Sequence, residues 1–131
     1  MKTALIILDG WGLGQTDGNN AIEVAETPYV DSLNAGVPHA KLRTDGEHVG
    51  LPNGQMGNSE VGHLNIGAGR VVYQDLLRID RAVADGSLAQ EPVLVDALKE
   101  ASKPGKRLHL MGLVSRGGVH SQQTHLHALV D

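Results

Sequence analysis

Residues 51–63 of the chain have the sequence LPNGQMGNSEVGH, in which a glycine-rich stretch runs directly into a serine. Either Asn58 or Ser59 can cap a helix that begins here, because both side chains can accept a hydrogen bond from a backbone N–H of the first turn. A serine at a helix amino terminus lies at the positive end of the helix dipole, which favours an alkoxide or a phosphate. Ser59 is therefore a candidate nucleophile, although its immediate neighbours alone fit a capping role better.

His63 follows Ser59 by one turn of the predicted helix, so the two side chains share a face. His63 is either a partner of the serine or a histidine packed in the interior, and we favour the packed histidine. The preceding residues 45–58 form a long glycine-rich loop. A loop of that length in a small domain is typically functional or mobile.

The amino terminus carries a second candidate, Asp9. Residues 3–8 are almost continuously apolar and end in Asp9 and Gly10, which predicts a buried, parallel strand with a loop at its carboxyl end. A carboxylate at that edge suits a hard divalent metal ion. An Asp-Gly pair is equally typical of a plain turn, so the residues alone leave both interpretations open.

The rest of the chain alternates between the two kinds of element. The pattern predicts further strands over residues 39–44 and 107–114, and helices over residues 28–36, from about 59, 71–84, 92–102 and 122–130. This alternation indicates an α/β fold with a largely parallel sheet. Ligands bind beyond the carboxyl ends of such strands, where Asp9 and residues 115–120 both lie.

His120 follows a pair of glycines at one of these strand ends. A histidine there can bind an anionic group or shuttle a proton, but a capping role explains it at least as well. His125 and His127 are two positions apart on a predicted helix and face different ways, which excludes them as a zinc pair. Arg78 and Arg81 share a helix face that we expect to be solvated, beside Asp75 and Asp80.

Composition narrows the function classes. The chain of 131 residues is 40% hydrophobic and 20% charged, with a net charge of −4 and no cysteine. Nothing in it indicates a nucleic-acid or membrane partner, a disulfide or a thiolate metal site, so we expect a cytoplasmic protein. The chain has 17 glycines, yet their spacing matches neither a dinucleotide fingerprint nor a phosphate-binding P-loop.

Five blocks in order resemble the cofactor-independent phosphoglycerate mutases. They are ALIILDGWG at residues 4–12, NAI at 20–22 followed by TP at 27–28, the stretch 49–70, HLMGL at 109–113 and GGVHS at 117–121. The resemblance implies an alkaline-phosphatase-like parallel-sheet domain, whose first part is residues 1–72, leading into an α/β transferase domain, whose first part is residues 73–131.

The resemblance also implies chemistry. Asp9 corresponds to a metal ligand, Ser59 to the nucleophile that also contacts a metal, and His120 to a substrate-binding residue. Two Mn²⁺ ions, or Mg²⁺ in some members, serve the family, and 2,3-bisphosphoglycerate is not needed. The implied reaction interconverts 3-phosphoglycerate and 2-phosphoglycerate through a phosphoserine in glycolysis and gluconeogenesis. The complete family enzyme is expected to be a monomer.

Departures from the family leave alternatives. Gln122 and Arg116 replace residues that are usual there, which we interpret as tuning. The remaining metal ligands and phosphate-binding residues have no counterpart here, so we expect this chain alone to be incomplete and inactive. The alternatives are a non-enzymatic fragment, or another metal-dependent phosphomonoesterase or phosphomutase of the alkaline-phosphatase superfamily. The block at residues 117–121 favours the phosphoglycerate enzyme over the latter.

Overall fold

The computed structural model describes residues 2–15, 17–118 and 120–131. The chain divides into two compact units, Met1–Arg43 and Thr44–Asp131, which we describe separately. Thr16 of the predicted loop after Asp9, and Val119 of the predicted glycine loop, lie outside the described residues. No helix in the described ranges is long and apolar enough to cross a membrane.

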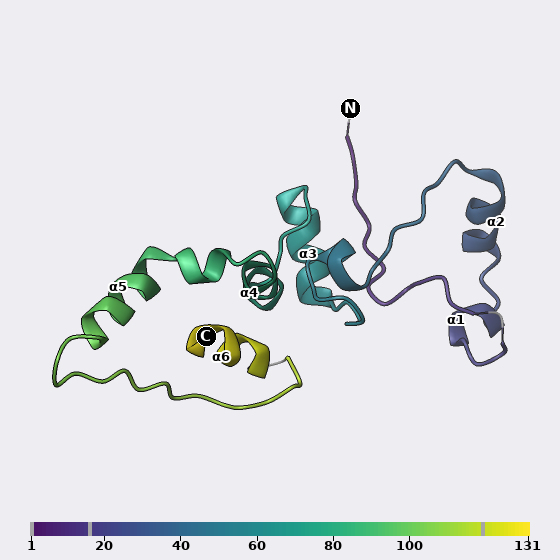
Figure 1. Ribbon diagram of the computed structural model, residues 1–131. Coiled ribbons are helices and arrows are strands. Elements are labelled where there is room, and N and C mark those ends of the chain that lie inside the picture. Colours follow the sequence, from purple (N-terminus) through teal and green to yellow (C-terminus); the bar gives the residue numbers. More distant parts are fainter. Residues whose placement is uncertain (1, 16, 119) are drawn as a thin grey trace. The chain divides into compact units, whose positions relative to one another are not determined.

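The first unit contains two helices, α1 (Ala21–Val24) and α2 (Pro28–Gly36) (Figure 1). The predicted start of α2 is confirmed, with Pro28 in its first turn and the chain leaving the helix after Gly36. Thr27 precedes the helix without capping its backbone. Its hydroxyl instead donates to Asp31 Oδ1 at 3.0 Å.

The predicted strands are not formed in the described residues, and Figure 1 draws no strand arrow. Residues 3–8, 39–44 and 107–114 have no ladder partner, and Leu5 and Ile6 are 74% and 80% exposed. A β-strand satisfies its backbone N–H and C=O groups only through a neighbouring strand. An apolar pattern thus indicates that a segment can join a sheet, but it does not show whether a neighbouring strand is present to pair with it. The predicted parallel sheet is therefore not confirmed within the described residues.

The second unit is helical. Its elements are η1 (Gly46–Val49), α3 (Ser59–Ala68), α4 (Asp75–Ala84), η2 (Ser87–Gln90), α5 (Pro92–Ala101) and α6 (Gln123–Val130). The helices predicted from about residue 59, over 92–102 and over 122–130 are confirmed within a residue or two at each end.

The helix predicted from residue 71 begins only at Asp75. The backbone N–H groups before it are already hydrogen-bonded to other segments. Val72 N–H donates to Asn65 Oδ1 at 2.8 Å, and Gln74 N–H donates to the Gly50 carbonyl at 2.8 Å. These two bonds hold the residues in extended geometry until the helix can start. The four-residue error therefore comes from tertiary hydrogen bonds that a helical pattern cannot reveal.

The small core also belongs to the second unit. Val49, Val61 and Leu77 are the buried hydrophobic residues of the described chain, at 8%, 5% and 3% exposure. They come from η1, α3 and α4. Helix α3 contacts η1, while α4 contacts both α6 and η2. The second unit thus draws its buried residues from elements on both sides of Ser59 along the chain, and α3 packs against η1.

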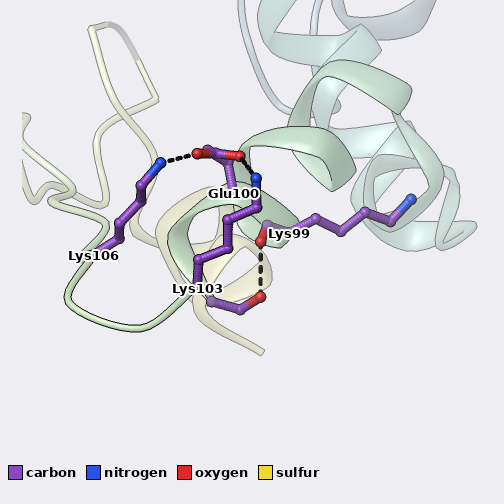
Figure 2. Close-up of polar contacts among 5 residues, drawn as sticks. Lys99, Glu100, Lys103 and Lys106 are labelled. Carbon is purple, nitrogen blue, oxygen red and sulfur yellow. Dashed lines mark hydrogen bonds and ion pairs between the residues drawn. The ribbon is translucent and has the colours of Figure 1, made fainter.

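The end of α5 is closed by charged side chains (Figure 2). Glu100 pairs with both Lys103 and Lys106, and the Lys99 carbonyl accepts a hydrogen bond from the Ser102 hydroxyl at 2.8 Å. Lysines at a helix carboxyl end are favourable because they offset the negative end of the helix dipole. Such exposed pairs contribute at most about 1 kcal/mol each, so they shape the turn rather than hold the unit together.

Candidate functional site

Ser59 occupies the first position of α3 and is exposed. Asn58, not Ser59, is the capping residue, since its Oδ1 accepts a hydrogen bond from Val61 N–H at 3.0 Å. Asn58 has the extended backbone that a cap requires, with φ −143° and ψ 172°. The cap leaves the Ser59 hydroxyl out of the capping role, so a plain capping function no longer accounts for this serine.

The loop before Ser59 is folded back on itself rather than loose. Asp45 and Met56 form an isolated antiparallel bridge, and Gly46 N–H donates to the Gln55 carbonyl at 2.9 Å. Gly57 lies so close to the neighbouring backbone that a Cβ there would sit 1.9 Å from the Thr44 carbonyl oxygen. Glycine at position 57 therefore allows a contact that fixes the approach of the chain to Ser59.

Asn65 joins three segments around α3. Its Nδ2 donates to the Val49 carbonyl at 3.1 Å, and its Oδ1 accepts from Val72 N–H at 2.8 Å. The side chain is part-buried, so these bonds are shielded from water and leave few alternatives for either partner. Asn65 thus fastens the helix that carries Ser59 to the segments on both sides of it.

His63 is exposed, so the prediction that it packs in the interior is wrong. Its Nδ1 lies 3.1 Å from Ser59 Oγ and 2.9 Å from the Ser59 carbonyl oxygen. The helix places the ring one turn beyond Ser59, where i and i+4 side chains meet. The alternative in which His63 is a partner of the serine is the one that the geometry supports.

The predicted solvated face on α4 is confirmed, because Arg78 and Arg81 are both exposed. Arg78 pairs with Asp75 at 3.0 Å on this surface. Arg81 instead pairs with Glu47 of η1 and lies 4.0 Å from the centre of the Tyr73 ring. The hydrogen bond to Glu47 raises the pKa of Arg81 above its ordinary value. Arg81 therefore joins α4 to the loop that leads to Ser59.

Asp9 lies in the first unit, in a tight turn. Trp11 N–H donates to the Leu8 carbonyl at 3.1 Å, and Gly10 has a positive φ of 79°. A turn with a positive φ at its third residue favours glycine there, which explains the Asp-Gly pair. The chain forms a turn here, and it presents Asp9 on an exposed bend directly after the apolar segment.

His120 lies in a closed turn of the second unit. Gly118 N–H donates to the Ser121 carbonyl at 3.0 Å, and Gln123 N–H donates to the Ser115 carbonyl at 2.7 Å. Gly118 is buried with φ 67°, and a Cβ there would come within 3.3 Å of Leu76 Cδ2. These contacts hold an exposed His120 at the entrance to α6.

A cleft of about 320 Å³ opens beside this turn. Its polar side chains are those of His120, Ser121, Gln122 and His125, and the remaining lining is largely aliphatic. Ser121 Oγ is buried and has no hydrogen-bond partner within the described chain. His125 Nε2 lies 2.6 Å from Asp80 Oδ1, which links α6 to α4 behind the cleft. The cleft has the size and the few convergent polar groups of a small-ligand site.

The three predicted site residues are distributed over both units. Asp9 belongs to Met1–Arg43, whereas Ser59 and His120 belong to Thr44–Asp131. The structure joins Ser59 to His63 and places His120 beside Ser121, each in its own local turn. Each predicted residue therefore has its own local surroundings.

The donor types of Asp9 and Ser59 suit a hard divalent cation, because both offer oxygen. Two oxygen ligands alone are too few to form a metal site. No group of three or more histidine, cysteine, aspartate or glutamate side chains able to hold a metal ion occurs within residues 2–15, 17–118 and 120–131. The described residues therefore do not form a complete metal centre.

Residues 1–125 match the metalloenzyme superfamily. The chain belongs to this superfamily. Among proteins similar to this superfamily member, one from Myxococcus xanthus is 60% identical over 129 residues, which is 98% of this chain and 25% of that protein. Another from Bacteroides thetaiotaomicron is 58% identical over 130 residues, or 99% of this chain and 26% of that protein. A third, from Vibrio cholerae, is 57% identical over 128 residues, or 98% and 25%.

All three relatives of this metalloenzyme-superfamily chain are named 2,3-bisphosphoglycerate-independent phosphoglycerate mutase. The resemblance predicted from the sequence blocks is therefore confirmed. The chain spans about a quarter of the length of the curated relatives that it matches.

The sequence analysis of this superfamily member missed the role of Asn65 and the contact between His125 and Asp80. Asn65 gave a usable signal, because asparagine is unfavourable inside a helix unless its side chain has a specific partner. The contact of His125 with Asp80 gave none, since the two residues are 45 positions apart and no local pattern connects them.

Proposed function

We propose that this chain is the amino-terminal part of a cofactor-independent phosphoglycerate mutase. The enzyme would interconvert 3-phosphoglycerate and 2-phosphoglycerate without 2,3-bisphosphoglycerate, through a phosphoserine at Ser59. The observation that carries the proposal is the placement of Ser59 at the first position of α3, with the capping role taken by Asn58. The names of relatives that are 55–60% identical over nearly the whole chain agree with it.

The geometry around Ser59 suits phosphoryl transfer. A ten-residue helix begins at the serine, and the positive end of its dipole favours the charge of a phosphoryl group. In the proposed step, Ser59 Oγ loses its proton and forms a bond to phosphorus, while the ester bond to glycerate breaks and the released glycerate oxygen takes up a proton. The reverse step returns the phosphoryl group to the other hydroxyl.

The remaining site assignments belong to the same proposal. Asp9 and Ser59 would each give an oxygen to Mn²⁺ or Mg²⁺, with further ligands from outside the described residues. Metal dependence itself is expected of a metalloenzyme-superfamily member. His120, at the mouth of the cleft before α6, would bind the glycerate. The relatives' length supports a fuller two-domain α/β enzyme in which residues 1–72 start the phosphatase-like domain and residues 73–131 start the transferase domain.

We place this small-molecule enzyme in the cytoplasm and expect the full-length protein to be a monomer.

The test of the proposal is Ser59→Ala in the full-length enzyme. Phosphoryl transfer should fall below detection, because the substitution removes the hydroxyl that would attack phosphorus, while circular dichroism should be unchanged. Asn53→Ala, an exposed substitution in the preceding loop, is the control and should keep its activity. Near-normal turnover of the Ser59→Ala variant would disprove the proposal.

A further inference from the structure

One ring nitrogen of His63 approaches two oxygens of the same residue. His63 Nδ1 lies 2.9 Å from the Ser59 carbonyl oxygen and 3.1 Å from Ser59 Oγ. Both distances are within the ordinary range for a hydrogen bond. The side chains of both residues are exposed, so a phosphorylated group can reach the serine while the contact is in place.

The carbonyl oxygen decides where the proton lies. A carbonyl only accepts hydrogen bonds, so a close approach by Nδ1 requires that Nδ1 carry the hydrogen. Nδ1 then has no free lone pair for the Ser59 hydroxyl proton, which excludes it as the base that activates the serine. Ser59 Oγ instead lies where it can accept a share of the same hydrogen, and the lone pair of the neutral ring belongs to Nε2.

We propose that His63 is a hydrogen-bond donor to the nucleophile. Its Nδ1–H orients Ser59 Oγ and stabilises the negative charge that the oxygen carries when it attacks phosphorus. Donation to the charged form of a group favours that form, and such bonds are stronger than those between neutral groups. The inference rests on the proposed function for its catalytic part, while the hydrogen bond itself is independent of any activity.

A second histidine supplies a matched control. His39 Nδ1 lies 2.9 Å from the Val37 carbonyl oxygen, on an exposed part of the chain. The same rule assigns the hydrogen of His39 to Nδ1. The two rings thus share an exposed Nδ1–carbonyl contact, and only the contact of His63 also involves a serine hydroxyl oxygen in the structure.

The first experiment tests the hydrogen bond in the chain itself. Nitrogen-15 NMR at alkaline pH, where the rings are neutral, distinguishes the two imidazole tautomers. We expect the Nδ1–H form for His63 and for His39. Ser59→Ala should leave His63 in that form, because the carbonyl oxygen remains. An Nε2–H tautomer at His63 would overturn the inference whatever the enzyme does.

The second experiment tests the catalytic part in the full-length enzyme. His63→Leu removes the donor and should lower kcat by roughly tenfold or more, with little change in KM, since a bond to a charged oxygen is lost. His63→Asn should recover most of the rate, because its Nδ2 can take the place of Nδ1. His39→Leu should be as active as the unchanged enzyme.

The outcomes separate the two claims. Full activity of His63→Leu beside an inactive Ser59→Ala variant would overturn the inference and keep the proposed function. Equal losses in His63→Leu and His63→Asn would also overturn it, because the donor would then be irrelevant. An active Ser59→Ala variant would remove the proposed function and with it the catalytic part of the inference, while the NMR result would still decide the hydrogen bond.

Discussion

The two compact units of the chain differ in what holds them together. No described residue of Met1–Arg43 is buried, and its apolar segment at residues 3–8 has no partner. In Thr44–Asp131, three apolar side chains are buried, and Asn65 hydrogen-bonds α3 to segments before and after this helix. The candidate nucleophile is therefore held by contacts of its own unit, whereas the Asp9 turn follows a segment whose pattern calls for strands that the described chain does not form.

The largest effect that we expect concerns activity. The candidate metal ligands are one carboxylate of the first unit, Asp9, and one serine of the second, Ser59, and the described residues gather no three-residue metal group. The 131-residue chain alone should therefore show no turnover of 3-phosphoglycerate with Mn²⁺ in a coupled assay. Steady product formation by the purified chain, independent of any full-length contaminant, would show that either unit carries more machinery than its contacts indicate.

Stability should show the difference between the units next. Leu77 is 3% exposed and Leu5 is 74% exposed. Leu77→Ala should lower the free energy of unfolding of the second unit by about 2–5 kcal/mol, because it leaves a cavity. Leu5→Ala should change the free energy of unfolding of the first unit by less than about 0.5 kcal/mol, because the side chain is already in water. Urea denaturation measures both, and equal effects of the two substitutions would remove the contrast between the units.

Asn65 gives a smaller and sharper test. Asn65→Ala removes two hydrogen bonds and strands the Val49 carbonyl and the Val72 N–H, which should cost the second unit about 2 kcal/mol. Asn53→Ala is the control, because its exposed bond to Glu47 at 3.2 Å should contribute less than about 0.5 kcal/mol. Amide exchange at Val72 should accelerate only in the Asn65 variant.

The smallest expected effect is a pH dependence that both units share. Hydrogen bonds from Asn19, chiefly from its backbone, lower the pKa of Asp17, and those from Ser87 lower the pKa of Asp85, below the ordinary 3.8. A lowered folded pKa contributes stability that is present above 3.8 and is lost as the pH falls through the folded value. Ser87→Ala should raise the pKa of Asp85 and leave that of Asp17 unchanged in a carboxyl NMR titration. A parallel change in Asp17 would mean that the two turns are coupled.

The same contrast explains how far the sequence could be interpreted. Helix starts at Pro28, Ser59 and Pro92 followed from local chemistry, because caps and first-turn prolines act within a few residues. The strands did not follow, because pairing is a property of two segments and the partner is not encoded in either. The delayed start of α4 and the contact of Arg81 with Glu47 could not be predicted either, because both depend on residues that are distant in the sequence.

The candidate site divides in the same way. Ser59 could be selected from its own segment, and the resemblance of the surrounding block gave it a role. His63 was placed on the correct face but given the wrong surroundings, because one turn of helix fixes direction and says nothing about burial. His125 and Asp80 could not be paired at all, since their contact exists only once α4 and α6 have packed.

The bridge between Asp45 and Met56 has a consequence for the order of folding. Two contacts that precede or span Ser59 in the sequence join segments that are close together along the chain. They are the bridge between Asp45 and Met56 and the hydrogen bond from Gln74 N–H to the Gly50 carbonyl. Closing short loops costs little chain entropy and is fast. We therefore expect the segment around Ser59 to assemble early, while a polypeptide still emerging from the ribosome has not yet presented its later segments. Pulse-labelled hydrogen exchange during refolding should protect Val72 before His125. Protection of His125 before Val72 would mean that the segment around Ser59 folds only after α6 has formed.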